Sequence, residues 1–126
     1  MSRELGLNEY QELAMRTCMP TCDNVSYMLL NLIGEVGELS SKIAKDIRKG
    51  NIVIGDIRND LTPLMPYDEW EKRHEEYALE LGDILWQLAG LAKVLGLTLD
   101  GIAQWNLIKL ASRAKRGKID GNGDHR

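Results

Sequence analysis

Apolar residues recur three or four positions apart along most of the chain, which is the spacing of an amphipathic α-helix. The pattern is clearest over residues 24–49, where Val25, Met28, Leu29 and Leu32 begin a long apolar stripe. The stripe stops at Gly50, and glycine ends helices readily because it adopts left-handed backbone angles without strain. One long helix is therefore expected over this stretch.

Three other segments show the same spacing and have recognisable ends. A polar residue whose side chain accepts a backbone N–H precedes or opens each of them, as expected of an N-cap. The predicted helices and their N-caps are 8–17 with Asn8, 68–95 with Asp68, and 99–116 with Thr98. Pro20, Gly96 and Gly117 end these helices, because proline and glycine interrupt helical geometry.

Residues 51–66 separate the second and third predicted helices and resemble an inserted loop or arm. The run Ile52-Val53-Ile54 is β-prone, so a short extended arm that packs on something, such as a second subunit, is expected. The tail, residues 118–126, is rich in glycine and polar residues and is expected to be a loop. The whole chain, residues 1–126, is the size of one domain.

A polar stripe lies beside the apolar stripe on each of the three longer predicted helices. Projection at about 100° per residue places these polar side chains at the edge of the apolar face, not opposite it. The stripes are Asn31, Glu35, Glu38 and Lys42; Glu76, Glu80, Asp83 and Gln87; and Asn106, Lys109 and Arg113. Helices packed through their apolar faces would bring such stripes toward a shared cleft.

The two acidic pairs, Glu35 with Glu38 and Glu80 with Asp83, have the spacing of one helical turn. Two carboxylates one turn apart can reach the same hard cation, and Mg²⁺ prefers oxygen ligands. A single Glu-x-x-Glu on a helix is usually a solvated surface. Its repetition beside two apolar stripes favours a metal site, which would position water and neutralise a transferring phosphoryl group.

Three segments resemble parts of the MazG-like, all-α nucleoside triphosphate pyrophosphohydrolases. They are Ile33-Gly34-Glu35-Val36-Gly37-Glu38-Leu39, then Glu80-Leu81-Gly82-Asp83-Ile84-Leu85, and then Asn106-Leu107-Ile108-Lys109-Leu110 with Arg113, Arg116-Gly117 and Gly121-x-Gly123-Asp124-x-Arg126. Each segment alone is a weak signal, but their order on the expected helices is fairly specific.

The resemblance implies an all-α, four-helix bundle-like fold that assembles as a homodimer or as a homotetramer made from dimers. It also implies hydrolysis of a (d)NTP to a (d)NMP and pyrophosphate, by attack of water at the α-phosphorus. The implied catalytic metal ligands are Glu35, Glu38, Glu80 and Asp83, which hold Mg²⁺, with Mn²⁺ as a substitute. The implied nucleotide contacts are Asn106, Lys109 and Arg113, with Lys42 and Lys45 as weaker candidates.

The sequence departs from this family at two informative positions. Val36 follows Glu35 where some members have adjacent glutamates, so one possible ligand is missing. Gln87 stands where dCTP-type members carry a tyrosine. The tryptophans, Trp70, Trp86 and Trp105, could stack a base or serve in packing, so the base and sugar preference stays open.

Composition and charge argue against binding to a nucleic acid polymer and against a membrane span. The net charge of −3 leaves no large basic surface for a nucleic acid polymer. The most apolar stretch, 84–99, is interrupted by Gln87 and Lys93 and is too short for a membrane span. With no signal peptide in the first ten residues, a cytoplasmic protein is expected. Cys18 and Cys22 are accordingly expected to be reduced, inert thiols.

Three alternatives remain open. Glu71-x-x-His74 has the spacing found in carboxylate-bridged di-iron bundles, but such a site needs two of these motifs and His125 lies in the tail without one. Within the family, the substrate could be phosphoribosyl-ATP, although the Gly-x-Gly-Asp-x-Arg segment favours the general nucleotide enzymes. A non-catalytic helical interaction module would show no metal-dependent turnover.

Overall fold

The computed structural model describes residues 3–55 and 61–117, and these are mostly helical. Their four α-helices are α1 Leu7–Met15, α2 Val25–Arg48, α3 Tyr67–Val94 and α4 Leu99–Lys115. A short 3-10 turn, η1, covers Pro20–Cys22, and two strands, β1 and β2, cover Ile52–Ile54 and Leu61–Pro63. The expected helical fold is thus confirmed, with a small strand pair added to it.

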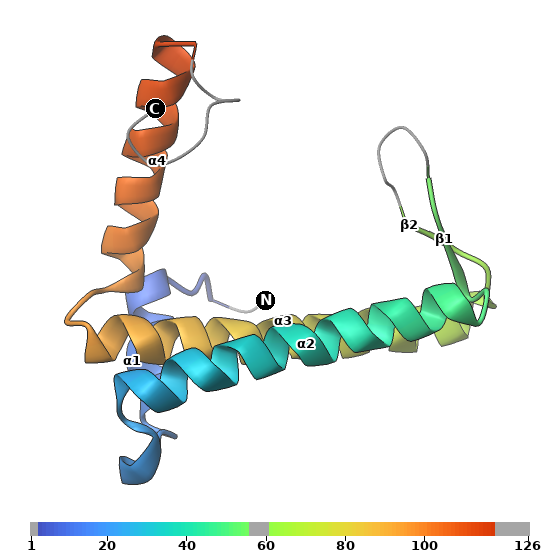
Figure 1. Cartoon of the computed structure of the whole chain (residues 1–126), viewed down its shortest axis with the longest axis horizontal. Helices are drawn as coiled ribbons and strands as arrows, with labels where there is room; N and C mark the ends of the chain where they lie inside the picture. The colour runs from blue at the N-terminus through green and yellow to red at the C-terminus, as the bar shows by residue number, and fades with distance from the viewer. Residues whose placement is uncertain (1–2, 56–60, 118–126) are drawn as a thin grey trace.

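Helices α2 and α3 lie side by side and antiparallel, and they form the long body of the molecule (Figure 1). Helix α1 packs across one end of this pair, where Met15, Met28, Ala89 and Leu99 form the core. Met28 has no exposed surface, and a Cβ added at Gly90 would lie 2.3 Å from its Sδ. Gly90 therefore lets the two long helices approach closely at this point.

Of the three predicted N-caps, the one of α4 is right and those of α1 and α3 are wrong. Thr98 accepts the Gly101 N–H at 3.1 Å, as predicted. Asn8 lies inside α1, which begins after Gly6, and its side chain instead accepts the Asp100 N–H at 2.9 Å. Asn8 therefore satisfies a free donor at the start of α4, a tertiary contact that local spacing does not reveal.

The N-cap of α3 is Pro66, two residues before the predicted Asp68. The helix begins at Tyr67, directly after Pro66, so Asp68 lies within its first turn. Proline fixes its own φ near helical values and needs no hydrogen-bond partner for its nitrogen, which favours a helix start at this point. Asp68 still stabilises the helix, because an acidic side chain in the first turn interacts favourably with the helix dipole.

The expected extended arm is present in the insertion. Strand β1 pairs antiparallel with β2, and Ile52 lies opposite Pro63. Ile52 is almost completely buried, so this strand packs on its own chain, against the end of α2. Residues 56–60 of the arm and the predicted tail, 118–126, lie outside the described residues.

The described part of a single chain does not close into a four-helix bundle. Helix α4 makes its main helix contact with α1 and rises steeply from the end of the α2–α3 pair (Figure 1). Many large apolar side chains on α2, α3 and α4 consequently remain exposed. They include Leu29, Leu30, Ile33, Val36, Leu81, Leu85, Leu88, Leu107 and Ile108.

Within the described ranges, no helix combines the length and the apolar character that crossing a membrane requires. Both cysteines, Cys18 and Cys22, are free thiols.

Candidate functional site

Carboxylates from α2 and α3 meet near the middle of the helix pair. Glu35, Glu38 and Glu80 each offer a carboxylate oxygen, and these three atoms lie within 4.8 Å of one another. This is the acidic cluster, and it is the one group of potential metal ligands found among the described residues. Two helices that pack through their apolar stripes have thus brought their acidic edges together.

Two oxygens of the acidic cluster lack a hydrogen-bond partner among the described residues. These oxygens are Oε2 of Glu35 and Oε2 of Glu80, and both are buried. Burial raises the pKa of the Glu35 carboxyl, and the charges of Glu38, Asp83 and Glu80 raise it further. Unpaired buried oxygens and crowded negative charge are both relieved by a cation at the same place.

Lys42, a predicted nucleotide contact, touches the acidic cluster directly. Its Nζ donates to Oε1 of Glu80 at 2.7 Å, and this bond raises the pKa of the lysine. The same side chain lines a pocket of about 550 Å³ together with Glu38 and Glu80. The cluster therefore borders an accessible space, with a positive charge at one side.

Asp83, the fourth predicted ligand, is exposed and is not part of the acidic cluster. Its charge nevertheless acts on that cluster, because it is one of the causes of the raised pKa of Glu35. It also contributes, after burial, to the raised pKa of Tyr10 on α1. The structure therefore places Asp83 near the cluster without joining it to the other three carboxylates.

Polar side chains continue the seam between α2 and α3 beyond Glu35. Asn31 Nδ2 lies 3.5 Å from Glu35 Oε1 and 3.4 Å from the Tyr27 hydroxyl, to both of which it donates. Gln87 on α3 is buried, and its Oε1 has no hydrogen-bond partner among the described residues. The predicted polar stripes thus supply Asn31 beside Glu35 on α2 and a buried amide, Gln87, on α3.

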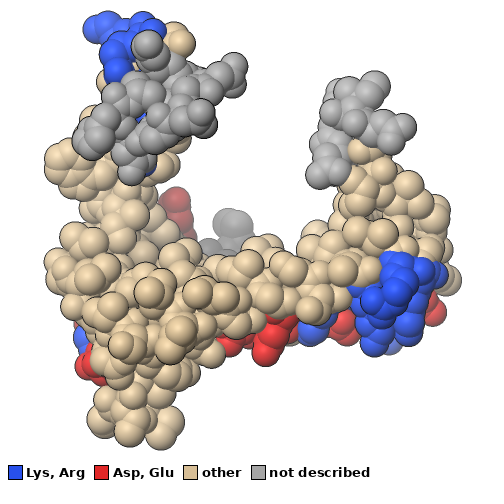
Figure 2. All heavy atoms as spheres, in the orientation of Figure 1, with Lys and Arg blue, Asp and Glu red and all other residues tan. Residues whose placement is uncertain are grey.

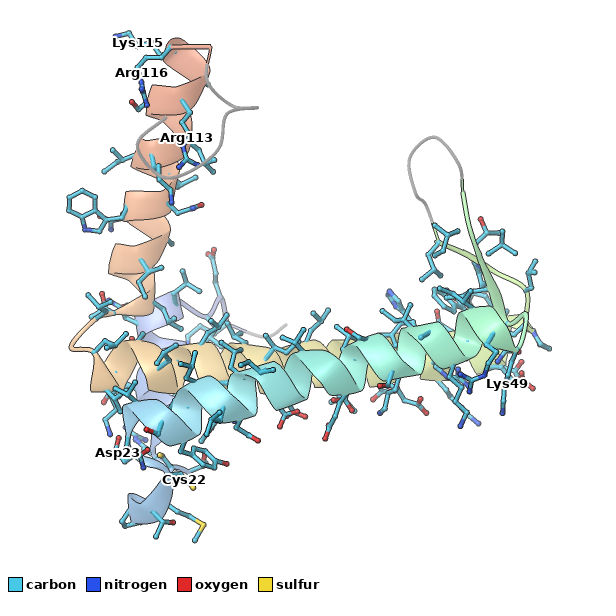
Figure 3. The ribbon with its side chains drawn as sticks, in the orientation of Figure 1. Cys22, Asp23, Lys49, Arg113, Lys115 and Arg116 are labelled. Atoms are coloured by element: carbon cyan, nitrogen blue, oxygen red, sulfur yellow. The ribbon has the colours of Figure 1, made fainter. Side chains whose placement is uncertain are left out.

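The predicted nucleotide contacts on α4 lie apart from the acidic cluster in a single chain. Asn106 and Lys109 line a different pocket, of about 630 Å³, together with the exposed Trp105. Arg113 is buried near the far end of α4 (Figure 3). The shared cleft expected for three helices is therefore formed by α2 and α3, without α4 of the same chain.

The other tryptophans have clearer roles in packing. Trp86 Nε1 donates to the Ala14 carbonyl at 3.2 Å and to Thr17 Oγ1 at 2.9 Å, which ties α3 to the end of α1. Trp70 stacks near His74, with ring centroids 5.3 Å apart. Because His74 is in this contact and outside the acidic cluster, the di-iron alternative gains no support from the described residues.

Sequence reasoning missed a buried ionic cluster near the end of α2. Asp46 is only 1% exposed and accepts hydrogen bonds from Arg73 Nη1, from the Tyr77 hydroxyl and from Asn51 Nδ2. Burial opposes its charge, but these three donors together lower its pKa to about 2. Helical projection contained the signal, since Asp46 and Arg73 both fall about 20° from the reference glutamate toward the apolar side.

The donor chemistry of the acidic cluster suits a hard divalent cation. All three of its ligand groups are carboxylates, with no sulfur or imidazole among them. Mg²⁺ prefers such oxygen ligands and commonly keeps several waters, so three protein oxygens are a sufficient protein contribution. The geometry is thus consistent with a divalent metal that would hold phosphate oxygens in the adjoining pocket.

Comparison with known proteins agrees with this geometry. Residues 24–117 match the MazG nucleotide pyrophosphohydrolase domain, a range that includes both acidic pairs and α4. The gene 37 protein of Mycobacterium phage L5 is 37% identical over 109 residues, which cover 83% of this chain and 82% of that protein. No solved structure matched the chain. Since the domain match spans most of its length, the chain belongs to the MazG nucleotide pyrophosphohydrolase family.

Proposed function

We propose that this protein hydrolyses a nucleoside triphosphate, (d)NTP + H₂O to (d)NMP + pyrophosphate, by attack of water at the α-phosphorus. One observation carries the proposal: carboxylates from two separate helices converge, and two of their buried oxygens have no partner among the described residues. Such a cluster is costly without a cation and well suited to one. The role would be to remove unwanted nucleotides or to tune the nucleotide pool.

In this proposal Glu35, Glu38 and Glu80 hold Mg²⁺, and Asp83 completes the set from its position beside them. A bound Mg²⁺ supplies Lewis-acid stabilisation of the phosphoryl charge and lowers the pKa of water. One of the two α2 glutamates also orients or deprotonates the attacking water. Lys42, already in contact with Glu80, is placed to donate to a phosphate oxygen in the pocket that both residues line.

The remaining nucleotide contacts are proposed to come from a second copy of the chain. Asn106 and Lys109 do not line the pocket beside the acidic cluster of their own chain. Apart from Leu30 and Leu79, most exposed apolar residues of α2 and α3 occupy the side of each apolar stripe farther from the glutamates, at about 80–160° in projection. A second α2–α3 pair packed on that side would bury them, forming the expected homodimer or homotetramer.

The test is a nucleotide panel assayed with Mg²⁺ in H₂¹⁸O, with separate measurements of pyrophosphate and orthophosphate. We expect pyrophosphate release from at least one (d)NTP, with ¹⁸O in the monophosphate. Orthophosphate release, or ¹⁸O in the pyrophosphate, would refute attack at the α-phosphorus. Phosphoribosyl-ATP belongs in the same panel, because it is the alternative substrate within the family. No metal-dependent turnover of any member would support the non-catalytic helical module instead.

A further inference from the structure

A second pocket follows directly along α2 from the acidic cluster. It has a volume of about 230 Å³ and is lined by four basic side chains, two carboxylates and one amide. These residues are Lys42, Lys45, Lys49, Arg73, Asp46, Glu76 and Asn51. We call it the basic pocket. Lys42 lines both this pocket and the one beside Glu38 and Glu80, so the two spaces are neighbours.

The three lysines continue the edge of α2 that carries Glu35 and Glu38. Projection at about 100° per residue places Lys42, Lys45 and Lys49 within roughly 60° of one another, on the same side as these glutamates. With a rise of about 1.5 Å per residue, Lys45 lies ~10 Å along the axis from Glu38. Figure 2 shows the same change of sign, from acidic atoms along the helix pair to basic atoms at its strand-bearing end.

Arg73 is held rigidly at the wall of the basic pocket. Its Nη1 donates to the buried Asp46, which also accepts from Tyr77, and its Nε lies 3.3 Å from Glu76. Among the described residues, its Nη2 has no hydrogen-bond partner in this arrangement. The buried carboxylate therefore fixes a guanidinium that still has donors to offer.

Lys42 is paired with Glu80, but the other two lysines of the pocket, Lys45 and Lys49, carry positive charge that no described carboxylate pairs with. Neither Lys45 nor Lys49 forms an ion pair with any described residue, and like charges three or four residues apart repel one another. Their position near the carboxyl end of α2 favours positive charge through the helix dipole. The dipole alone, however, does not require three lysines to share one edge with Arg73 opposite them.

We propose that the basic pocket binds the β- and γ-phosphates of the substrate, while the α-phosphate lies beside the acidic cluster. This inference rests on the proposed function and extends it, because it assigns the recognition of chain length in the polyphosphate to Lys45, Lys49 and Arg73. The carboxyl-terminal half of α2 would then hold the pyrophosphate that leaves. Charge-assisted bonds from lysine and arginine are the usual means of binding such an anion.

The test compares Lys45→Gln and Lys49→Gln with Lys72→Gln, which removes the same charge from an exposed position outside the pocket. For the best triphosphate substrate, each pocket variant should raise KM about tenfold, the usual effect of losing one charge-assisted bond. The inhibition constant of the monophosphate product should not change, since that product has no β- or γ-phosphate. Equal changes in both constants, or no difference from Lys72→Gln, would overturn the proposal.

A binding measurement separates this proposal from the proposed function. Inorganic tripolyphosphate, titrated calorimetrically into the intact protein, should bind the wild type and Lys72→Gln with equal affinity and Lys45→Gln about tenfold more weakly. That result would support the pocket even if no nucleotide were hydrolysed. Equal affinity for all three proteins, or no binding to the wild type, would overturn the proposal that the basic pocket binds phosphates. Neither result would bear on whether the protein hydrolyses triphosphates.

Discussion

At Glu35, burial and the charges of three neighbouring carboxylates act in the same direction, and together they raise the pKa of its carboxyl. A carboxyl whose pKa is higher in the folded state holds its proton more tightly there than in the unfolded chain. The stability of the metal-free fold should therefore fall as the pH rises from the pKa of Glu35 in the unfolded chain to its higher pKa in the folded state. Above that range the stability should stay lower. In the absence of a cation, the ionised Glu35 opposes folding at neutral pH.

Glu35→Gln should consequently have opposite effects with and without metal. In EDTA at pH 7, the variant should melt at a higher temperature than the wild type, because a neutral side chain removes the repulsion. With Mg²⁺ the wild type should gain stability and the variant should gain much less, since ligand binding stabilises the folded state only where the ligand binds. Thermal melts of both proteins check this, with the exposed Glu75→Gln as control. A Mg²⁺ gain as large in Glu35→Gln as in the wild type would exclude Glu35 from the metal site.

Glu38→Gln and Asp83→Asn test the two sides of the proposed site by their effect on turnover. Each replacement keeps the shape of the side chain and removes one negative oxygen, so the fold should persist and the rate should fall by orders of magnitude. Steady-state rates with the best substrate, together with circular dichroism, provide the measurement. Near-normal rates in both variants would remove these residues from the site. A loss in Glu38→Gln alone would match the exposed position of Asp83 outside the acidic cluster.

At the scale of the elements, Asp46 joins three segments of the chain. It receives hydrogen bonds from Arg73 and Tyr77 on α3 and from Asn51 before β1. Its pKa is lowered to about 2, whereas burial and the hydrogen bond to Asp46 raise the pKa of Tyr77 to about 12. A lowered carboxyl pKa contributes stability that is present above the unfolded value, near 3.8, and is lost as the pH falls toward 2.

Asp46→Asn should therefore destabilise the protein in a pH-dependent way. At pH 7 the loss in free energy of unfolding should be about 2 kcal/mol, from a shift of nearly two pKa units. The difference between variant and wild type should shrink as the pH is lowered from 4 to 2, because the wild-type carboxylate is then protonated as well. Urea titrations over this pH range provide the test. A difference that does not depend on pH would mean that Asp46 acts through its shape and not its charge.

Much of the element structure could be predicted from the sequence, because helix spacing and end signals are local. The ends at Gly50 and Gly96 were predictable, since both adopt the positive φ that glycine tolerates. The contact of Asn8 with α4 was not predictable, because it depends on a distant segment of the chain. The start of α3 after Pro66 was not predicted either, because Asp68 is the more usual type of N-cap residue. Local projection placed Glu35, Glu38 and Glu80 at the edges of the two apolar faces, but their convergence also depends on the handedness of the helix packing, which the sequence does not give.

At the scale of the whole molecule, the direction of α4 could not be predicted from the sequence. Its polar stripe has the same projection as those of α2 and α3, yet it leaves the helix pair steeply and packs mainly on α1 (Figure 1). Periodicity defines which face of a helix is apolar, but it does not define which chain covers that face. The same limit explains why the apolar stripes of α2 and α3, expected to be packed, are partly exposed in one chain.

The proposed self-association can be tested on that exposed face. Ile33 on α2 is 65% exposed, and replacing it with aspartate would place a charge in the predicted interface. Ile33→Asp and Leu85→Asp should convert the assembly to a monomer while retaining helical content. Met19→Asp is the control, because Met19 is 63% exposed but lies outside α2, α3 and α4. Light scattering after size exclusion would measure the mass of each protein in solution. A monomeric wild type would contradict the proposed self-association.

The most direct test of the central claim is a crystal structure of the protein with Mn²⁺, with the ion located by its anomalous scattering. The account predicts an ion in direct contact with carboxylate oxygens of both α2 and α3, namely Glu35 or Glu38 on one helix and Glu80 on the other. Ions found only elsewhere, or held by one helix alone while the other carboxylates point away, would contradict it.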